Sequence, residues 1–315
     1  MRRREILMLL TGAAAWPRHA QAQPGAVPRV GVLMFAPTLE PFVTYLRHAL
    51  RELGYIEGKT IQLVLRSTDD PKLLATYAAE LVRQNVNVIA VVRGVAAAAA
   101  KLATRDIPIV LTQVPDAVAM GLVTSLAKPG GNVTGVSVNT IAAAGKTLEL
   151  SREIMRGLRR VASLVDVTAP GALYAEEVER AGKNLTIDIQ TIRVKGVAGV
   201  SAAVPALNKM RPDAAMVQPS LGMPAAELVL KQRIVPVAPS STLAAACLMT
   251  YSADVAEIYR TAAGYVDRIL KGAKPADLPV QQPTKFEVVI NQKVARAFGV
   301  TVPESVLLRA DKVIE

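Results

Sequence analysis

The chain has 315 residues, which at ordinary domain sizes predicts two domains. Apolar residues make up 51% of the sequence and charged residues 20%, a balance that excludes a disordered chain. The formal net charge is +11, but the basic residues are scattered rather than gathered with aromatic ones, so nucleic-acid binding is not expected.

The first residues have the layout of a secretory signal. A cationic start at residues 2–4 precedes an apolar run at 6–15, and the small residues at 20 and 22 match the two positions that a signal peptidase needs. The apolar run is about ten residues long, whereas a bilayer needs roughly 20. We therefore expect cleavage after Ala22 and a periplasmic mature protein. The consecutive arginines also fit a twin-arginine pattern, which leaves both export routes open.

Strand and helix patterns alternate through the first half of the mature chain. Apolar runs bounded by turn formers predict strands at 30–35, 61–65, 86–92, 107–111 and 133–138. Amphipathic or capped segments predict helices at 39–53, 70–84, 96–104 and 120–127. This alternation favours right-handed crossovers and a parallel sheet that is covered on both faces.

A second alternating series follows. Strands are expected at 161–167, 185–194, 214–217 and 234–237, and helices at 142–158, 173–183, 202–210 and 225–231. Two successive sheets of about five strands each favour two similar lobes, although the strand count is also compatible with a single (β/α)8 barrel. A further helix at 254–270, a proline-rich connector and a late strand at 286–290 indicate a chain that returns to lobes already built.

The residue types that most enzymes use for catalysis are scarce. His48 is the one histidine of the mature chain and Cys247 the one cysteine, so Ser-His-Asp, Cys-His and histidine-rich metal sites are not expected. Residues 135–139 lack the last glycine of a nucleophile elbow, and 145–147 lack the first glycine of a phosphate-binding loop. We predict no catalytic residue, no metal and no cofactor, and we do not expect an enzyme.

Candidate ligand-binding residues follow the predicted strands. In doubly wound sheets, ligands bind beyond the carboxyl ends of the strands. Gly94 lets a ligand approach the backbone there, and the helix behind it directs its positive end to the same place. Asp116 suits either the cap of its own helix or a ligand ammonium. Arg93 suits either a solvated strand end or a second acidic group of a ligand.

Three stretches of the sequence resemble a known family. They are the arginine start ahead of 30–34, the segment LVTSLAKPGGNVTG at 122–135, and a tail at 265–286 that continues into 290–291 and 302–303. Together they resemble the substrate-binding proteins of ABC transporters, in the group related to tryptophan and tyrosine receptors.

The resemblance implies an α/β protein with the type 1 periplasmic-binding fold, in which two Rossmann-like lobes are joined by three crossovers. The crossovers are expected near 137–140, 250–254 and 279–284. The expected division is a signal peptide at 1–22, an N-terminal lobe of 23–138 plus 254–280, and a C-terminal lobe of 139–253 plus 281–315.

The resemblance also implies a ligand held in the cleft between the lobes. The residues expected to line that cleft are Ala36, Pro37, Thr38, Gly94, Gln113, Asp116, Asn139, Pro219, Ser220 and Tyr251. The ligand carboxylate is expected at backbone N–H groups near Gly94 and Ser220, the ammonium at Asp116 and the side chain against Tyr251. Arg93 stands where relatives tend to have a small residue.

The expected function is the exported, periplasmic solute-binding component of an ABC importer. Such a monomeric receptor captures an amino-acid-like or aromatic carboxylate by hinge closure and presents it to an ABC permease in the inner membrane. A periplasmic ligand sensor for a membrane kinase or chemoreceptor is the alternative. A periplasmic enzyme is less favoured because Asp116 has no evident acidic partner.

Overall fold

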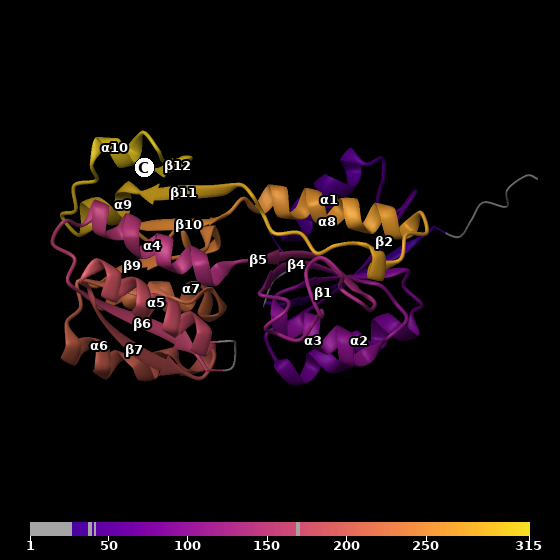
Figure 1. Cartoon of the computed structure of the whole chain (residues 1–315), viewed down its shortest axis with the longest axis horizontal. Helices are drawn as coiled ribbons and strands as arrows, with labels where there is room; N and C mark the ends of the chain where they lie inside the picture. The colour runs from indigo at the N-terminus through magenta and orange to yellow at the C-terminus, as the bar shows by residue number, and fades with distance from the viewer. Residues whose placement is uncertain (1–26, 37–39, 41, 168–170) are drawn as a thin grey trace, which may run out of the picture.

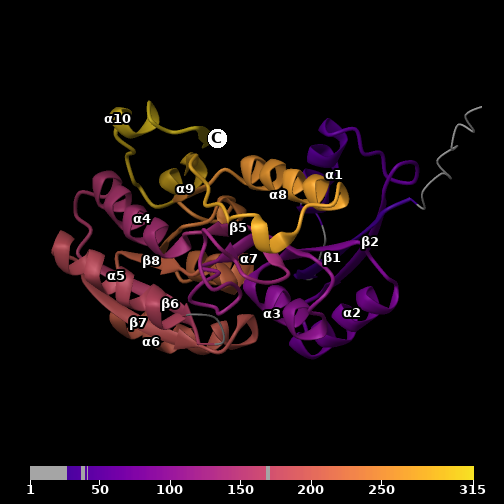
Figure 2. The same cartoon turned by 45° about the vertical axis from the view of Figure 1, so that its right-hand side comes forward.

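The computed structural model describes residues 27–36, 40, 42–167 and 171–315. The predicted signal at 1–22 lies outside them. The described chain forms two α/β lobes that lie side by side (Figures 1 and 2), each built on its own sheet. Two separate sheets exclude the single barrel that the strand count had allowed.

The first lobe is a parallel sheet with the strand order β2-β1-β3-β4-β5. Its strands are β1 (Arg29–Phe35), β2 (Gln62–Thr68), β3 (Val88–Val92), β4 (Ile109–Pro115) and β5 (Val133–Val138). Its helices are α1 (Phe42–Glu52), α2 (Pro71–Arg83), α3 (Gly94–Ala103) and α8 (Val255–Leu270). All five predicted strands are therefore confirmed, with shifts of a few residues at their ends.

The second lobe has a sheet of seven strands in the order β12-β11-β10-β9-β8-β6-β7. Its strands are β6 (Arg160–Asp166), β7 (Asp188–Val194), β8 (Ala214–Val217), β9 (Val235–Ala238), β10 (Met249–Ala253), β11 (Phe286–Asn291) and β12 (Lys312–Ile314). Its helices are α4 (Thr140–Ile154), α5 (Gly171–Leu185), α6 (Val204–Met210), α7 (Gly222–Lys231), α9 (Gln292–Ala297) and α10 (Glu304–Leu307). Short 3₁₀ helices of this lobe are η1 (Val197–Ala203), η2 (Pro219–Leu221) and η3 (Ser241–Leu243), whereas η4 (Pro275–Asp277) packs against β5 of the first lobe. Strand β11 is antiparallel to β10, while the other pairs are parallel.

Each sheet is buried on both faces. Successive side chains of a strand point to opposite sides, and helices cover both sides. In the first lobe, Val32 and Met34 face the core under α1 and α8, whereas Leu33 faces the core under α2 and α3. The second sheet is likewise covered by α4, α5, α9 and α10 on one face and by α6 and α7 on the other. This double cover explains why the central strands read as unbroken apolar runs.

The predicted helix at 120–127 is wrong, since the structure has turns there. Gly121 has a φ of +64°, outside the helical region. The Lys101 ammonium donates to the carbonyl oxygens of Gly121 and Leu122, at 2.6 and 3.0 Å, and thus takes acceptors that a helix would use. The Thr124 hydroxyl closes the next turn on the carbonyl of Lys128 at 2.9 Å.

Within the described residues the chain passes three times between the lobes, between β5 and α4, between β10 and α8, and between η4 and β11 (Figure 1). The prediction of two lobes with three crossovers is therefore confirmed. The third crossover leaves the first lobe at Gln281, which forms a parallel bridge with Val136 of β5.

The second and third crossovers are fastened to each other by acidic side chains. Asp254 caps α8, where its Oδ1 accepts from the backbone N–H groups of Ala256 and Glu257, and its Oδ2 accepts from the Lys285 ammonium at 2.8 Å. The Glu257 carboxylate accepts from the backbone N–H of Lys285 at 3.2 Å. Burial opposes ionisation of Asp254, but these hydrogen bonds, above all the one from Lys285, hold the pKa of its carboxyl below the ordinary value.

The Asp254→Ala variant is expected to lose about 1 kcal/mol of unfolding free energy at pH 7, since a helix cap and an ion pair disappear together. A lowered folded-state pKa stabilises the fold fully above the ordinary carboxyl value of about 4, and this stabilisation is lost as the pH falls through the lowered value. Urea unfolding from pH 7 to pH 3 should therefore show the two proteins converging in acid. The control is Asp70→Ala, which removes the cap of α2 far from the crossovers. An equal and pH-independent loss in both variants would contradict the role of Lys285.

Candidate functional site

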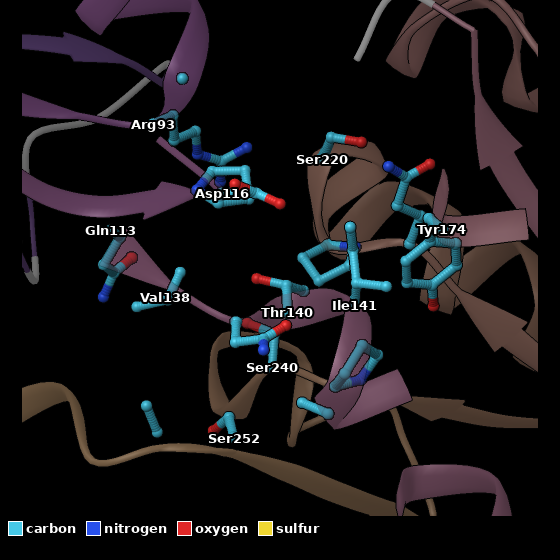
Figure 3. Close-up of a pocket in the computed structure, with 18 of the residues that line it drawn as sticks. Arg93, Gln113, Asp116, Val138, Thr140, Ile141, Tyr174, Ser220, Ser240 and Ser252 are labelled. Carbon is cyan, nitrogen blue, oxygen red and sulfur yellow. The ribbon is translucent and has the colours of Figure 1, made fainter. Parts of the chain in front are cut away.

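A cavity of about 490 Å³ lies between the two lobes, beyond the carboxyl ends of β3 and β4 (Figure 3). Most of its wall is apolar, with side chains such as Phe35, Met120, Ile141 and Phe286. The polar and charged residues of the wall are Arg93, Gln113, Asp116, Asn139, Thr140, Asp166, Tyr174, Gln218, Ser220, Ser240, Ser241, Thr242 and Ser252. A space of this size and composition suits a small organic molecule with an apolar body and a few polar groups.

Arg93 lies between β3 and α3, at the end of the central strand of the first lobe. Its backbone has φ 76° and ψ 152°, a region that essentially only glycine occupies without strain. Figure 3 shows its side chain pointing into the cavity. Burial lowers the pKa of the guanidinium from its ordinary value. The cavity therefore contains a partly desolvated cation.

Asp116 follows the neighbouring strand β4, and its side chain also points into the cavity (Figure 3). One carboxylate oxygen accepts a hydrogen bond from the backbone N–H of Ala119 at 3.0 Å, which fixes the turn after the strand. Nearby, a Cβ atom on Gly94 would lie 2.3 Å from the terminal carbon of Met120. The missing side chain at Gly94 thus makes room for Met120 in the cavity wall.

The first crossover enters the site at its floor. Asn139 accepts a hydrogen bond from the backbone N–H of Ala142 at 3.0 Å through Oδ1 and so caps α4. The next two residues, Thr140 and Ile141, belong to the first turn of α4 and line the cavity (Figure 3). The segment that links the lobes is therefore also part of the candidate binding surface.

The second lobe contributes a wall of hydrogen-bonding groups. The side-chain oxygen of Gln218 accepts from the backbone N–H of Asp166 at 2.7 Å, and the Asp166 carboxylate accepts from that of Gly196 at 3.0 Å. By contrast, the Tyr174 hydroxyl and the Ser220 Oγ are buried and have no hydrogen-bond partner within the described residues. Buried polar atoms are seldom left without a partner. Neither oxygen is exposed at the cavity surface, so these two groups support the wall from behind.

The structure brings together most of the described residues that the sequence suggested. Gly94, Gln113, Asp116, Asn139, Pro219 and Ser220 all line the cavity. Pro37 and Thr38 lie outside the described residues. Ala36 and Tyr251 do not line the cavity. Ala36 is buried in the first-lobe core, where its carbonyl accepts a hydrogen bond from Ser67.

Aromatic residues other than Tyr251 line the cavity. Tyr251 stacks on Phe286 with ring centroids 5.2 Å apart and packs against the second-lobe core, while Phe286 itself reaches the cavity. Phe35 at the end of β1 and Tyr174 on α5 were missed. The position of Phe35 at a strand end was a usable signal, but nothing in the sequence around Tyr174 indicates that α5 reaches the cleft.

The described residues contain neither a metal-binding cluster nor a membrane-spanning helix. No group of three or more His, Cys, Asp or Glu residues there could hold a metal ion. No helix in the described part of the chain is long and apolar enough to cross a membrane.

Two Rossmann-like lobes, three crossovers and a cavity between the lobes define a ligand-binding protein with the type 1 periplasmic-binding fold. The profile of the family described as "ABC transporter substrate binding protein" matches residues 29–314. The chain therefore belongs to the family of ABC transporter substrate-binding proteins.

Individual relatives agree with this assignment. The tyrosine-binding protein of Clostridioides difficile (strain R20291) is 25% identical over 258 residues, which cover 79% of this chain and 74% of that protein. A solved ABC domain from Streptococcus pneumonia in complex with L-Trp is 25% identical, with a TM-score of 0.84 over 91% of this chain and 99% of that one. A conserved domain protein from Vibrio cholerae is also 25% identical, with a TM-score of 0.83 over the same shares.

Proposed function

We propose that this protein is the exported, periplasmic solute-binding component of an ABC importer, and that it captures an amino-acid-like or aromatic carboxylate. In this proposal the mature chain begins at residue 23, acts as a monomer and presents its ligand to a permease in the inner membrane. The lobes are assigned as 23–138 plus 254–280 and 139–253 plus 281–315. The reaction is binding and release, without chemical change of the ligand.

The observation that carries the proposal is the composition of the cavity between the lobes. Its described wall combines an apolar surface with one cation, Arg93, and with Asp116 directly after the neighbouring strand. A zwitterion with an apolar side chain is complementary to such a wall. The relatives that bind L-Trp or tyrosine, by their names, support the same ligand class.

The position of each group suggests how the ligand lies. The positive end of α3 at Gly94 and the region of Ser220 suit a carboxylate, and Asp116 suits an ammonium. The side chain of the ligand then lies against Phe35, Ile141 and Tyr174 instead of Tyr251. Because these groups belong to different lobes, a bound ligand stabilises the arrangement in which the lobes are close, and binding shifts the hinge equilibrium towards closure.

Isothermal titration of the mature chain against L-tyrosine, L-tryptophan and a panel of aromatic carboxylates tests the proposal. We expect at least one of these compounds to bind and to reduce the radius of gyration in small-angle scattering. Native mass spectrometry of the freshly purified protein should also show a retained small molecule.

A cavity-filling variant provides the control. Ala98→Trp places an indole at the cavity wall and should abolish binding, whereas Ala75→Trp on the exposed part of α2 should not. A protein that binds none of these compounds, retains no small molecule and does not change its dimensions would contradict the proposal.

A further inference from the structure

Arg93 is the one cation among the described residues of the cavity wall, and it has no anionic partner among the described residues. It forms no ion pair there, not even with Asp116 on the adjacent strand β4, and its side chain makes no hydrogen bond to another described residue. Arginine cannot neutralise itself at physiological pH. A desolvated guanidinium without a partner costs free energy that a bound anion can recover.

The titratable group beside Arg93 does not provide the missing charge. The titratable group that interacts electrostatically with the Arg93 guanidinium is the phenol of Tyr259, on α8. Burial raises the pKa of the Tyr259 phenol far above its ordinary value, so the phenol is neutral at physiological pH. Asp166 belongs to the opposite lobe and accepts a hydrogen bond from the backbone N–H of Gly196.

The backbone of Arg93 is a second observation that points to a ligand. Its φ and ψ of 76° and 152° lie in a region that essentially only glycine occupies, and such strain costs a residue with a Cβ of the order of 1–3 kcal/mol. Glycine would relieve the strain, and the desolvated charge adds a further cost. Two unfavourable features at one residue of the cavity wall are typical of a functional position rather than of a structural one.

We propose that Arg93 is the specificity-determining residue of the cleft, which binds an acid group of the ligand and makes that group a requirement for binding. The inference rests on the proposed function and names the side chain that recognises the acid. The guanidinium offers a planar pair of N–H donors to a carboxylate, beside the backbone N–H groups at the start of α3.

The arrangement also limits the net charge of the ligand. Arg93 and Asp116 follow adjacent strands of the same lobe and have opposite charges. One acid group and one ammonium on neighbouring atoms of a ligand match this pair. A second acid group would find no further cation among the described residues of the wall. The ligand is therefore an acid with a single carboxylate, and it contacts the first lobe through both of its charges.

The test compares a carboxylate with its neutral amide on wild-type protein and on Arg93→Gly, with L-tyrosine and L-tyrosinamide as probes in isothermal titration. The wild-type protein should bind L-tyrosine much more tightly than L-tyrosinamide. Arg93→Gly should weaken L-tyrosine binding by about 30-fold or more and leave binding of the amide nearly unchanged, because one partner of a charge pair inside the cleft is removed. Arg93→Lys should fall between the two, since it keeps the charge but loses the planar donor pair.

A second measurement does not need a known ligand. Ligand-free Arg93→Gly should unfold about 3 °C above ligand-free wild type, because glycine relieves the strained backbone and the desolvated charge disappears. Arg211→Gly is the matched control, since Arg211 is an exposed arginine with φ 47° at the end of α6. That variant should leave the preference for L-tyrosine unchanged.

Each outcome decides the question. Equal binding of L-tyrosine and L-tyrosinamide by wild type, or an unchanged preference in Arg93→Gly, would overturn the inference while the proposed function stands. If no probe binds wild type, the proposed ligand class fails. The unfolding temperatures then decide, because a rise in Arg93→Gly that exceeds the rise in Arg211→Gly supports the inference, and an equal, unchanged or lower value overturns it.

Discussion

Replacing Gly135 with alanine is expected to lower the free energy of unfolding by about 4 kcal/mol, the sum of backbone strain and overpacking. Gly135 has a φ of +120°, which residues with a Cβ rarely adopt, and it lies in β5 at the edge of the first sheet. A Cβ atom there would lie 2.4 and 2.5 Å from the backbone O and N of Leu111 in β4. A backbone neighbour in a sheet cannot move aside as a flexible side chain can.

The Gly135→Ala substitution would also affect the third crossover. The carbonyl of Gly135 accepts from the backbone N–H of Gln281, and the carbonyl of Gln281 accepts from that of Ser137, both at 2.9 Å. A displaced Gly135 therefore loosens the third crossover as well as the pairing of β4 with β5. Thermal denaturation should show a midpoint about 10 °C lower.

Gly131→Ala is the matched control for this variant, because it lies in the same PGGNVTG segment. Gly131 is exposed, a Cβ there meets no atom within 4 Å, and its φ is not in the left-handed region. We expect a change of less than about 0.5 kcal/mol. Similar losses in both variants would show that the segment tolerates no alanine for a reason other than contact with Leu111.

The Asp116→Asn variant is expected to weaken L-tyrosine binding by about 100-fold, because the ligand ammonium would lose its charged partner in a desolvated site. Asparagine keeps a side-chain oxygen that can accept the hydrogen bond from the backbone N–H of Ala119, so the turn after β4 is preserved. The variant therefore separates the charge of Asp116 from its structural role.

A matched pair of ligands makes this result specific. 3-(4-Hydroxyphenyl)propanoate has the body and the acid of tyrosine without the ammonium, and its affinity should change by less than about threefold. The control is Asp106→Asn, at an exposed position of the same lobe, which should alter neither affinity. If both ligands lose affinity equally in Asp116→Asn, Asp116 acts through the shape of the turn and not through the ammonium.

The sequence predicted the architecture well because the sheets are covered on both faces. Buried parallel strands such as β3 read as unbroken apolar runs, and capping residues such as Asp70 mark helix starts. The failures occur where long-range contacts decide the backbone. Lys101 takes the carbonyl groups of Gly121 and Leu122, and β12 forms by parallel pairing with β11. Neither contact leaves a periodic pattern.

The candidate site was predictable to the extent that strand ends determine it. Gly94, Gln113 and Asp116 follow or end strands of one sheet, so topology alone places them together. Tyr174 and Tyr251 show the limit of such reasoning. Which of the two rings lines the cavity depends on how α5 and β11 pack in the second lobe, and Tyr251 is turned onto Phe286. The direction of these two side chains is set by packing in the assembled core, and the local sequence does not encode it.

The interleaved chain path has a consequence for synthesis. Helix α8 packs against α1 through Tyr259 and Tyr45, whose rings lie 5.9 Å apart, and the Leu278 carbonyl accepts a hydrogen bond from Thr134. The apolar face of β1 and β3 beneath α8 is thus uncovered while a ribosome is still translating the second lobe. The first lobe of a nascent chain therefore exposes apolar surface until Leu278, close to the end of the 315-residue chain, has been synthesised.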